Sequence, residues 1–290
     1  MEWLRIRPDG TYIDATVGLG GHAVEIAKKL QLGRLIGIDR DAQALEIARE
    51  RLKEFESKVN LVHSSFSRID EVARRLKLAP ADGILADLGV SSLQLDTPER
   101  GFSFRGAGPL DMRMDSGESE TAADIVNHRP EQELADLIYR YGEERNSRRI
   151  ARAIVRSRPI RDTEHLATVV AGAQKVRGRQ KLHPATKTFL ALRIAVNREL
   201  EDLEQFLDRA PATLNSKGRC IVLSYHSLED RLVKHAFRRL AQQGVVKVLT
   251  KHVVIPTPEE IRTNPRARSA KMRVAEKINP WEPGPEPSAA

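Results

Sequence analysis

The sequence predicts an α/β fold, in which a doubly wound parallel sheet is interrupted after its fourth strand by a helical insertion. Two observations carry this prediction. Up to about residue 95, short apolar runs alternate with amphipathic helical patterns, which is typical of a parallel sheet covered by helices. From residue 122 to 179 the pattern is helical throughout, and a strand-like run returns only at 218–224.

The first elements form a strand, a turn and a helix. Tyr12 and Ile13 mark an apolar strand that runs into a glycine-rich turn, and apolar residues then recur at helical spacing from Ala23 to Leu30. Because the carboxyl ends of parallel strands meet at one edge of the sheet, ligand-binding residues should follow these strands. The further elements expected before the insertion are strands at 34–38, 59–62 and 83–86 and helices at 42–52 and 68–78.

The insertion and the C-terminal part complete the predicted architecture. Residues 98–118 are rich in glycine and proline, and a long helix is expected at 185–207. The later strands are expected at 218–224, 245–254 and 272–275, the last two as a hairpin at the sheet edge. The predicted domains are a sheet domain in two segments (1–103 and 189–279), an inserted helical domain that overhangs the ligand crevice (104–188) and a disordered proline-rich tail (280–290).

Positive charge is concentrated in the predicted insertion. The whole sequence has a formal net charge of +8, and residues 145–193 contain 13 Lys and Arg against 2 Asp and Glu. A smaller basic run lies at 262–273. Charged runs are often solvated helix faces, but this concentration in one stretch favours contact with RNA or DNA, because a localised basic field adds salt-dependent affinity for a polyanion.

The composition also excludes several classes of site and location. The single cysteine, Cys220, excludes an intramolecular disulfide and favours a cytoplasmic protein. No apolar run approaches the length of a membrane span, about 18 residues, so no membrane partner is expected. The histidines show none of the spacings with cysteine that bind metals, so no metal site is expected either.

The most informative segment is Asp14-Ala-Thr-Val-Gly-Leu-Gly-Gly-His22, followed by Asp39 at the end of the next predicted strand. A glycine-rich turn between a strand and a helix lets the backbone approach a ligand closely, and the later acid can accept hydrogen bonds from ribose hydroxyls. This pattern predicts an adenosine site. The glycines alone fit a nicotinamide dinucleotide, S-adenosylmethionine (SAM) with Asp14 as the leading acid, or a plain tight turn.

The other residues at the predicted strand ends favour SAM. Asp39 would hold the ribose, Phe66 would cover the adenine, and Asp87 would meet the cationic methionine end of SAM. A nicotinamide makes no comparable demand for a carboxylate. His22 and His226 also fall at strand ends that face this crevice, although a lone histidine is more often a helix-start or satisfied core residue.

Several longer segments carry a more specific resemblance. Besides residues 14–22, they are Asp87-Leu-Gly-Val-Ser-Ser92, Arg100-Gly-Phe-Ser-Phe104, Pro109-Leu-Asp-Met-Arg-Met114, Leu182-His-Pro-Ala-Thr186, Ala191-Leu-Arg-Ile-Ala-Val-Asn197, His226-Ser-Leu-Glu-Asp-Arg231 and Asn264-Pro-Arg-Ala-Arg268. With these segments, in this order and over nearly the whole chain, the sequence resembles the bacterial 16S rRNA (cytosine-N4)-methyltransferases, the RsmH (MraW) family.

The resemblance implies a SAM-dependent enzyme that methylates the exocyclic N4 amine of a cytidine in the decoding centre of 16S rRNA. It implies a Rossmann-like class I methyltransferase sheet with an inserted helical domain, and 16S rRNA or the small ribosomal subunit as the partner. With Gly18 of the turn, the cofactor residues are then expected to be Gly20, Gly21, His22, Asp39, Phe66, Asp87 and Gln94.

Methylation of an exocyclic amine is helped by a group that accepts a proton, because the N4 lone pair of cytosine is delocalised into the ring. Asp87 and His226 are the catalytic candidates, with Ser91 and Ser224 as further possibilities. The target base must be splayed out to reach them. The basic residues expected to hold RNA phosphates are Arg148, Arg149, Arg152, Lys175, Arg177 and Arg179.

Two departures from family patterns bear on activity. The family has a stretch with a His-x-Pro-Val motif ahead of the point at which this sequence begins, and Asp87-Leu-Gly-Val stands where many amino-methylating enzymes have Asn/Asp-Pro-Pro-Tyr. Two other functions stay open at this point. One is a nicotinamide-dependent dehydrogenase, and the other is a non-catalytic RNA-binding assembly factor with a vestigial SAM site. The oligomeric state is open as well.

Overall fold

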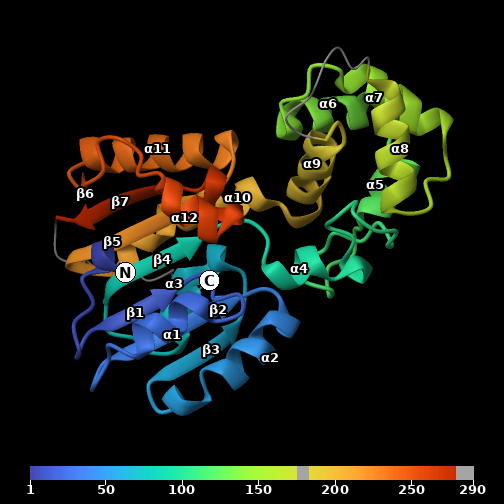
Figure 1. The fold of residues 1–290 in the computed structure, drawn as a ribbon. Helices are drawn as coiled ribbons and strands as arrows, with labels where there is room; N and C mark the ends of the chain where they lie inside the picture. The colour runs from blue at the N-terminus through green and yellow to red at the C-terminus, as the bar shows by residue number, and fades with distance from the viewer. Residues whose placement is uncertain (175–182, 279–290) are drawn as a thin grey trace, which may run out of the picture. The chain divides into compact units, whose positions relative to one another are not determined.

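The computed structural model describes residues 1–174 and 183–278 and divides into two compact units (Figure 1). The first, here called the sheet unit, consists of Met1–Gly89 with Leu200–Ala290. The second, the helical unit, is Val90–Glu199. The chain therefore leaves the sheet unit once and returns to it once, as an inserted domain requires.

The helical unit is wider at both ends than the 104–188 predicted for the insertion. Phe102 and Phe189 lie outside that predicted range, yet both are buried in the hydrophobic core of the helical unit. Their burial explains the difference, because a domain boundary read from sequence does not show which core an apolar residue joins. The predicted tail at 280–290 lies outside the described residues.

The sheet unit is built on one seven-stranded sheet with the order β3-β2-β1-β4-β5-β7-β6. Strands β1 to β5 are parallel, and β7 is antiparallel to both of its neighbours. This confirms the predicted doubly wound α/β fold, whose strand order reverses between β1 and β4, the place where such sheets bind ligands. The strands are β1 (Thr11–Asp14), β2 (Arg34–Asp39), β3 (Val59–His63), β4 (Ala81–Asp87), β5 (Leu214–Ser224), β6 (Val246–Val248) and β7 (Lys271–Lys277).

Helices cover both faces of the sheet, because successive strand residues point to opposite faces. Tyr12 belongs to one hydrophobic core and its neighbour Ile13 to the other. The first core is lined by α1 (Gly21–Ala27) and α2 (Ala42–Arg51), and the second by α3 (Ile69–Arg75), α10 (Glu199–Arg209) and α11 (Ser227–Gln242). The shorter elements are η1 (Glu2–Leu4), η2 (Lys53–Phe55), η3 (Phe66–Arg68), η5 (Ala210–Thr213), α12 (Pro258–Thr263) and η6 (Pro265–Ser269).

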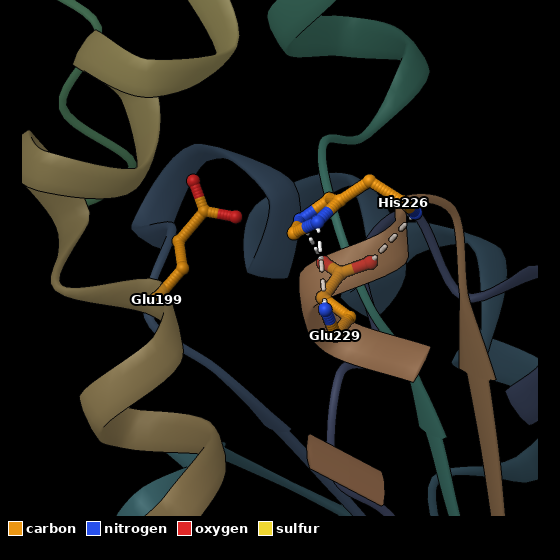
Figure 2. A group of neighbouring side chains, drawn as sticks. All are labelled: Glu199, His226 and Glu229. Carbon is orange, nitrogen blue, oxygen red and sulfur yellow. Dashed lines mark hydrogen bonds and ion pairs between the residues drawn. The ribbon is translucent and has the colours of Figure 1, made fainter. Parts of the chain in front are cut away.

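The turn after β5 is held by the first residues of α11 (Figure 2). His226 is the N-cap, and its Nδ1 accepts a hydrogen bond from the Glu229 amide. In return, Glu229 Oε2 accepts from the backbone N–H groups of Tyr225 and His226, at 2.8 and 3.3 Å. This reciprocal capping fixes the backbone at the point where β5 ends.

The long helix predicted at 185–207 was wrong, because the structure has two helices there. The first is α9 (Thr186–Asn197), and α10 follows it. Arg198 lies between them with a left-handed φ of 50°, which no residue inside a right-handed helix adopts. The apolar spacing continues through this position, so periodicity alone did not reveal the break.

The strand predicted at 245–254 was too long, because only β6 forms a regular ladder with β7. Thr250 Oγ1 accepts a hydrogen bond from the backbone N–H of Val274 at 3.0 Å, so a side chain takes the place of a backbone partner. Val254 meets the edge of β7 again only through an isolated bridge to Met272. A side-chain acceptor thus ends the regular pairing of this edge strand.

The helical unit packs its helices around a separate hydrophobic core. This confirms the helical pattern read over residues 122–174. The helices are α4 (Ser92–Asp96), η4 (Pro98–Arg100), α5 (Ala122–His128), α6 (Glu131–Gly142), α7 (Ser147–Arg156), α8 (Thr163–Ala173) and α9. In residues 1–174 and 183–278, no helix combines the length and the apolar character that crossing a membrane needs.

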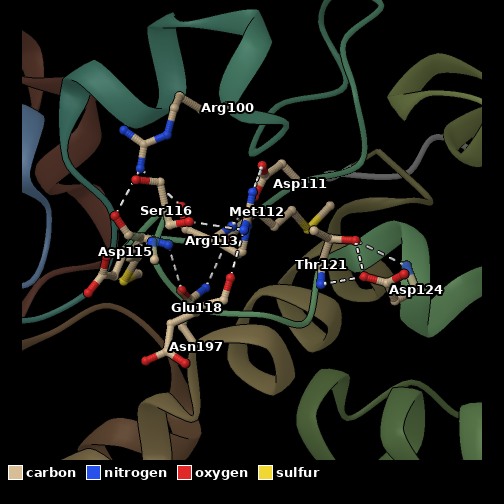
Figure 3. A network of polar contacts seen from close by, with 12 residues as sticks. Arg100, Asp111, Met112, Arg113, Asp115, Ser116, Glu118, Thr121, Asp124 and Asn197 are labelled. Carbon is tan, nitrogen blue, oxygen red and sulfur yellow. Dashed lines mark hydrogen bonds and ion pairs between the residues drawn. The ribbon is translucent and has the colours of Figure 1, made fainter.

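The glycine- and proline-rich stretch at 98–118 is fixed by a polar network within the helical unit (Figure 3). The guanidinium of Arg113 donates to both carboxylate oxygens of Asp111, each at 2.8 Å. Arg100 Nη2 donates to the carbonyls of Arg113 and Met114, each at 3.0 Å. Asn197 of α9 accepts from Met114 N at 2.7 Å, so the loop is attached to a helix far along the chain.

Candidate active site

The carboxyl ends of the parallel strands bring the predicted acids to one edge of the sheet unit. Asp14, Asp39 and Asp87 are the last residues of β1, β2 and β4. These strands are neighbours, because β1 pairs with both β2 and β4. Each acid therefore stands where the strand order predicts a ligand site.

The glycine-rich turn after β1 leaves its backbone open. Gly18 and Gly20 have φ values of 50° and 83°, which are left-handed and suit glycine. A side-chain carbon built on Gly18 would come no closer than 3.9 Å to another atom, and one on Gly21 would meet nothing within 4 Å. Space therefore exists along this turn for a ligand that contacts the backbone.

Asp39 is held by two backbone amides. Its Oδ2 accepts from Gly18 N at 2.7 Å, and its Oδ1 accepts from Asp41 N at 2.9 Å. Burial raises the pKa of the Asp39 carboxyl, while these two hydrogen bonds oppose the rise. Each carboxylate oxygen has a second acceptor position, so the group can still receive both hydroxyls of a ribose.

Phe66 lies directly after the β3 turn, in η3. Its ring packs edge-on against Phe206 of α10, with ring centroids 5.3 Å apart and an interplanar angle of 63°. Ser65 Oγ accepts from Ser67 N and so fixes the start of η3. These contacts hold an aromatic ring at the end of β3, the strand next to β2, and β2 ends on Asp39.

Asp87 is bonded from three directions. Its backbone N–H donates to Thr16 Oγ1 at 2.7 Å, and its carboxylate lies 3.2 Å from His22 Nε2. The other carboxylate oxygen accepts from the Tyr225 hydroxyl at 2.8 Å. The hydrogen bond to Asp87 raises the pKa of His22, against the effect of burial.

Asp14 is the most deeply buried of the three acids, with no exposed surface. Its Oδ1 accepts a long hydrogen bond from Thr16 N at 3.4 Å, and its Oδ2 has no partner among the described residues. Burial raises the pKa of Asp14 to about 7, helped by the charges of Asp87 and Asp39 and opposed by that of His22. A buried polar atom without a partner marks a place where a ligand or water completes the structure.

The two catalytic candidates lie at the ends of neighbouring strands, Asp87 as the last residue of β4 and His226 two residues after β5, but they have different partners. Asp87 contacts His22 and Tyr225, whereas His226 Nε2 lies 3.0 Å from Glu229 Oε1 (Figure 2). Ser224 is buried, and its hydroxyl donates to the carbonyl of Lys271 at 3.3 Å on the antiparallel neighbour β7. The catalytic roles of Asp87, His226 and Ser224 stay predictions.

Gln94 belongs to the helical unit, as does Ser91. Gln94 Oε1 accepts from Ser91 N at 3.0 Å, and Ser91 Oγ accepts from Gln94 N at 3.3 Å, which is a capping box at the start of α4. The role of Gln94 toward a cofactor therefore stays a prediction. Sequence alone did not suggest this local structural role.

The basic candidates for RNA contact are divided between described and undescribed residues. Arg148, Arg149 and Arg152 lie on α7, all three exposed, while Ile150 and Ile154 of the same helix are buried. Arg152 Nε also lies 3.3 Å from Glu131 Oε1. Lys175, Arg177 and Arg179 lie outside the described residues. The phosphate-binding role of all six residues stays a prediction.

These groups fit an adenosine ligand with a positive charge. The open turn and Asp39 suit the nucleoside, and Asp87 supplies negative charge at the point where the strand order reverses, joined by Asp14 as the pH rises through about 7. A dinucleotide would bring its anionic pyrophosphate to this glycine turn, close to both acids. SAM carries a sulfonium and an ammonium group, so the donor set suits it better.

Comparison with known proteins decides the family. The family model described as the MraW methylase family matches residues 1–278. The chain belongs to the MraW methylase family. Relatives named "Ribosomal RNA small subunit methyltransferase H" occur in Koribacter versatilis, with 52% identity over 285 residues, and in Solibacter usitatus, with 51% identity over 276 residues. Both alignments cover 95% of this chain, and they cover 90% and 96% of the two relatives.

Membership of the MraW methylase family confirms the resemblance that the motifs indicated. It confirms SAM as the cofactor and identifies the doubly wound sheet as the Rossmann-like fold of a methyltransferase. The dehydrogenase alternative is excluded. Tyr225 is the contact of this site that sequence reasoning missed, although its place directly after β5, next to the end of β4, was a usable signal.

The burial of Asp14 predicts a pH-dependent cost to stability. The native state keeps a proton on Asp14 up to about pH 7, whereas the unfolded chain releases it near the ordinary pKa of 3.8. Asp14 therefore contributes its full stability below pH 3.8, and this contribution is lost as the pH rises to about 7. Asp14→Asn removes this titration. The free energy of unfolding of the variant, relative to that of the wild type, should therefore increase by a few kcal/mol as the pH rises from 4 to 8.

Urea unfolding of both proteins across this pH range measures the difference. The same comparison in a His22→Gln background is the control, because it removes the coupled histidine and leaves the Asp14 carboxyl in place, so the pH-dependent difference should persist there. A difference between Asp14→Asn and wild type that stays flat from pH 4 to 8 would contradict the assignment.

Proposed function

We propose that this protein transfers the methyl group of SAM to the exocyclic N4 amine of a cytidine in the decoding centre of 16S rRNA. The observation that carries the proposal is the similarity to methyltransferases named for small-subunit ribosomal RNA, at about half identity over almost the whole chain. The cytosine and its place in the rRNA come from the family resemblance of the motifs. The substrate is naked RNA, a small subunit or an assembly intermediate.

Different residues at the sheet edge would bind different parts of SAM. Asp39 would accept the ribose hydroxyls and Phe66 would cover the adenine. The open backbone at Gly18 and Gly21 would let the cofactor approach closely, while Gly20 supplies the left-handed turn between them. Asp87 would balance the positive charge of the methionine end, and Asp14, whose pKa is raised to about 7, would add its charge once it loses its proton. Bound there, SAM supplies the electrophilic methyl group.

Methyl transfer to N4 depends on position more than on a strong base. The cytosine amine is a poor nucleophile, and holding it in line with the donor can supply about 7–11 kcal/mol of barrier reduction in favourable cases. A group that accepts a hydrogen bond from the amine would favour the pyramidal nitrogen of the transition state, and general-base help of this kind is typically worth about 10²–10⁴-fold.

Asp87 is better placed for this role than His226. Nδ1 of His226 accepts from the Glu229 amide, so the proton of a neutral ring lies on Nε2, which is 3.0 Å from the Glu229 carboxylate without forming a hydrogen bond. A neutral ring in this arrangement has no lone pair left for a substrate. Asp87 retains acceptor positions beyond those used by His22 and Tyr225, since each carboxylate oxygen can accept twice.

The exposed arginines of α7 would hold the RNA backbone. Arg148 and Arg149 point away from the core to which Ile150 and Ile154 contribute. Phosphate contacts fix the position of an RNA without reading its sequence, so these residues would add salt-dependent affinity. The choice of the target base would then be made where the base is splayed out of the RNA.

The decisive test of the function is methyl transfer itself. Small subunits from cells that lack the gene should accept label from radioactive SAM, and mass spectrometry should place the new methyl group on N4 of a single cytidine of 16S rRNA. Subunits from wild-type cells are the control, because they are already modified and should accept little label. Binding of RNA and SAM without methyl transfer would favour the non-catalytic assembly factor instead.

Matched variants separate the two candidates for the proton acceptor. Asp87→Asn keeps the shape of the side chain and removes its charge, so the single-turnover rate at saturating SAM should fall about 100-fold. His226→Asn removes the ring but keeps a good N-cap for α11, so its rate should stay within about threefold of wild type. An unchanged rate in Asp87→Asn removes Asp87 from the mechanism, and a 100-fold loss in His226→Asn assigns the role to His226.

Neutralising the α7 face should weaken RNA binding and leave SAM binding intact. The double variant Arg148→Ala/Arg149→Ala should flatten the dependence of RNA affinity on salt, and the logarithmic slope should fall by up to about 0.7 for each phosphate that is no longer neutralised. Arg49→Ala/Arg51→Ala, on α2 of the sheet unit, removes the same charge from another surface and serves as the control. Equal effects in both variants would show that net charge, rather than the α7 face, carries the RNA.

A further inference from the structure

Tyr225 contacts the acid on which the proposed site depends. It follows the last residue of β5, and its hydroxyl donates to Asp87 Oδ1 at 2.8 Å. Burial raises the pKa of this hydroxyl, and the negative charge of Asp87 raises it further. The phenol therefore stays protonated, so it is a permanent neutral donor to the carboxylate.

The ring of Tyr225 is held in place before any ligand binds. Its backbone N–H donates to Glu229 Oε2 at 2.8 Å, within the capping arrangement of α11. A side-chain carbon built on Gly89, which has a φ of 99°, would lie 3.6 Å from the ring. The ring thus packs beside the backbone that follows β4, the strand that carries Asp87.

The second carboxylate oxygen of Asp87 has a different kind of partner. Oδ2 lies 3.2 Å from His22 Nε2, whose side chain is 43% exposed. The backbone of Asp87 is fixed separately through Thr16 Oγ1. One oxygen is therefore bound to a neutral hydroxyl, and the other faces a partially exposed imidazole whose pKa is raised.

We propose that Tyr225 is a positioning residue, which binds one oxygen of Asp87 so that the other oxygen is directed at the cationic methionine end of SAM. The inference rests on the proposed place of SAM at this edge of the sheet. Without the hydroxyl, the Asp87 carboxylate can rotate about its last bond and share its charge with water. Cationic ligands should then bind more weakly, whereas the affinity for neutral ligands should stay the same.

A pair of ligands makes this distinction measurable. SAM carries the sulfonium and ammonium charges, whereas 5′-methylthioadenosine is a neutral thioether with the same adenosine part. Tyr225→Phe removes only the hydroxyl, so the fold should be kept. In calorimetry, the variant should bind SAM about tenfold more weakly, while its affinity for methylthioadenosine should stay within about twofold of wild type.

A second background tests whether the effect passes through Asp87. In an Asp87→Asn protein the charge is already lost, so adding Tyr225→Phe should change SAM affinity less than about twofold. Tyr12→Phe is the matched control, because Tyr12 is a buried tyrosine of the same unit whose hydroxyl bonds to the backbone of Arg5 and Arg7. It should change the affinity for neither ligand.

The outcomes separate this inference from the proposed function. A wild-type protein that does not bind SAM overturns both. A wild-type protein that binds SAM, with Tyr225→Phe weakening both ligands equally, shows a packing role and overturns the inference alone. Unchanged SAM affinity in Tyr225→Phe, or a full tenfold loss in the Asp87→Asn background, also overturns it.

Discussion

The accumulation of carboxyl groups at one edge of the sheet is the constraint on which the site depends. Asp14, Asp39 and Asp87 are the last residues of three neighbouring strands, so the order of the strands brings their carboxyl groups to one edge of the sheet. Backbone amides compensate Asp39, and a histidine and a tyrosine compensate Asp87. Asp14 keeps one oxygen without a partner among residues 1–174 and 183–278. A cationic cofactor favours the ionised form of these carboxyl groups, including Asp14 with its pKa raised to about 7, which a neutral or anionic cofactor cannot do.

The two units of this MraW methylase meet opposite electrostatic demands. The edge of the sheet unit is acidic, as suits a sulfonium donor, whereas α7 of the helical unit exposes arginines, as suits a polyanion. The acids and the arginines belong to units with separate hydrophobic cores, so each set of like charges is held by its own unit. The formal net charge of +8 therefore says less about function than the separation of acidic and basic groups between the two units.

The sequence predicted the features that follow from strand alternation and from the strand-end rule. Strand alternation led to the sheet, and the strand-end rule led to Asp14, Asp39 and Asp87. What it missed depends on contacts between distant residues. The break at Arg198 is a single backbone angle, the shortened β6 depends on the Thr250 hydroxyl, and the Tyr225 contact needs β4 and β5 to be adjacent. The order within 98–118 likewise depends on Asn197, on a later helix.

The pairing of β4 with β5 has a consequence for biosynthesis. The whole helical unit lies between these strands in the chain, so β4 leaves the ribosome long before its neighbour exists. Until then the edge of β4 that faces β5 has no partner strand. The apolar surface of the sheet that α10 and α11 later cover is exposed as well. The helical unit is one continuous segment with its own hydrophobic core, so it can fold before β5 is made.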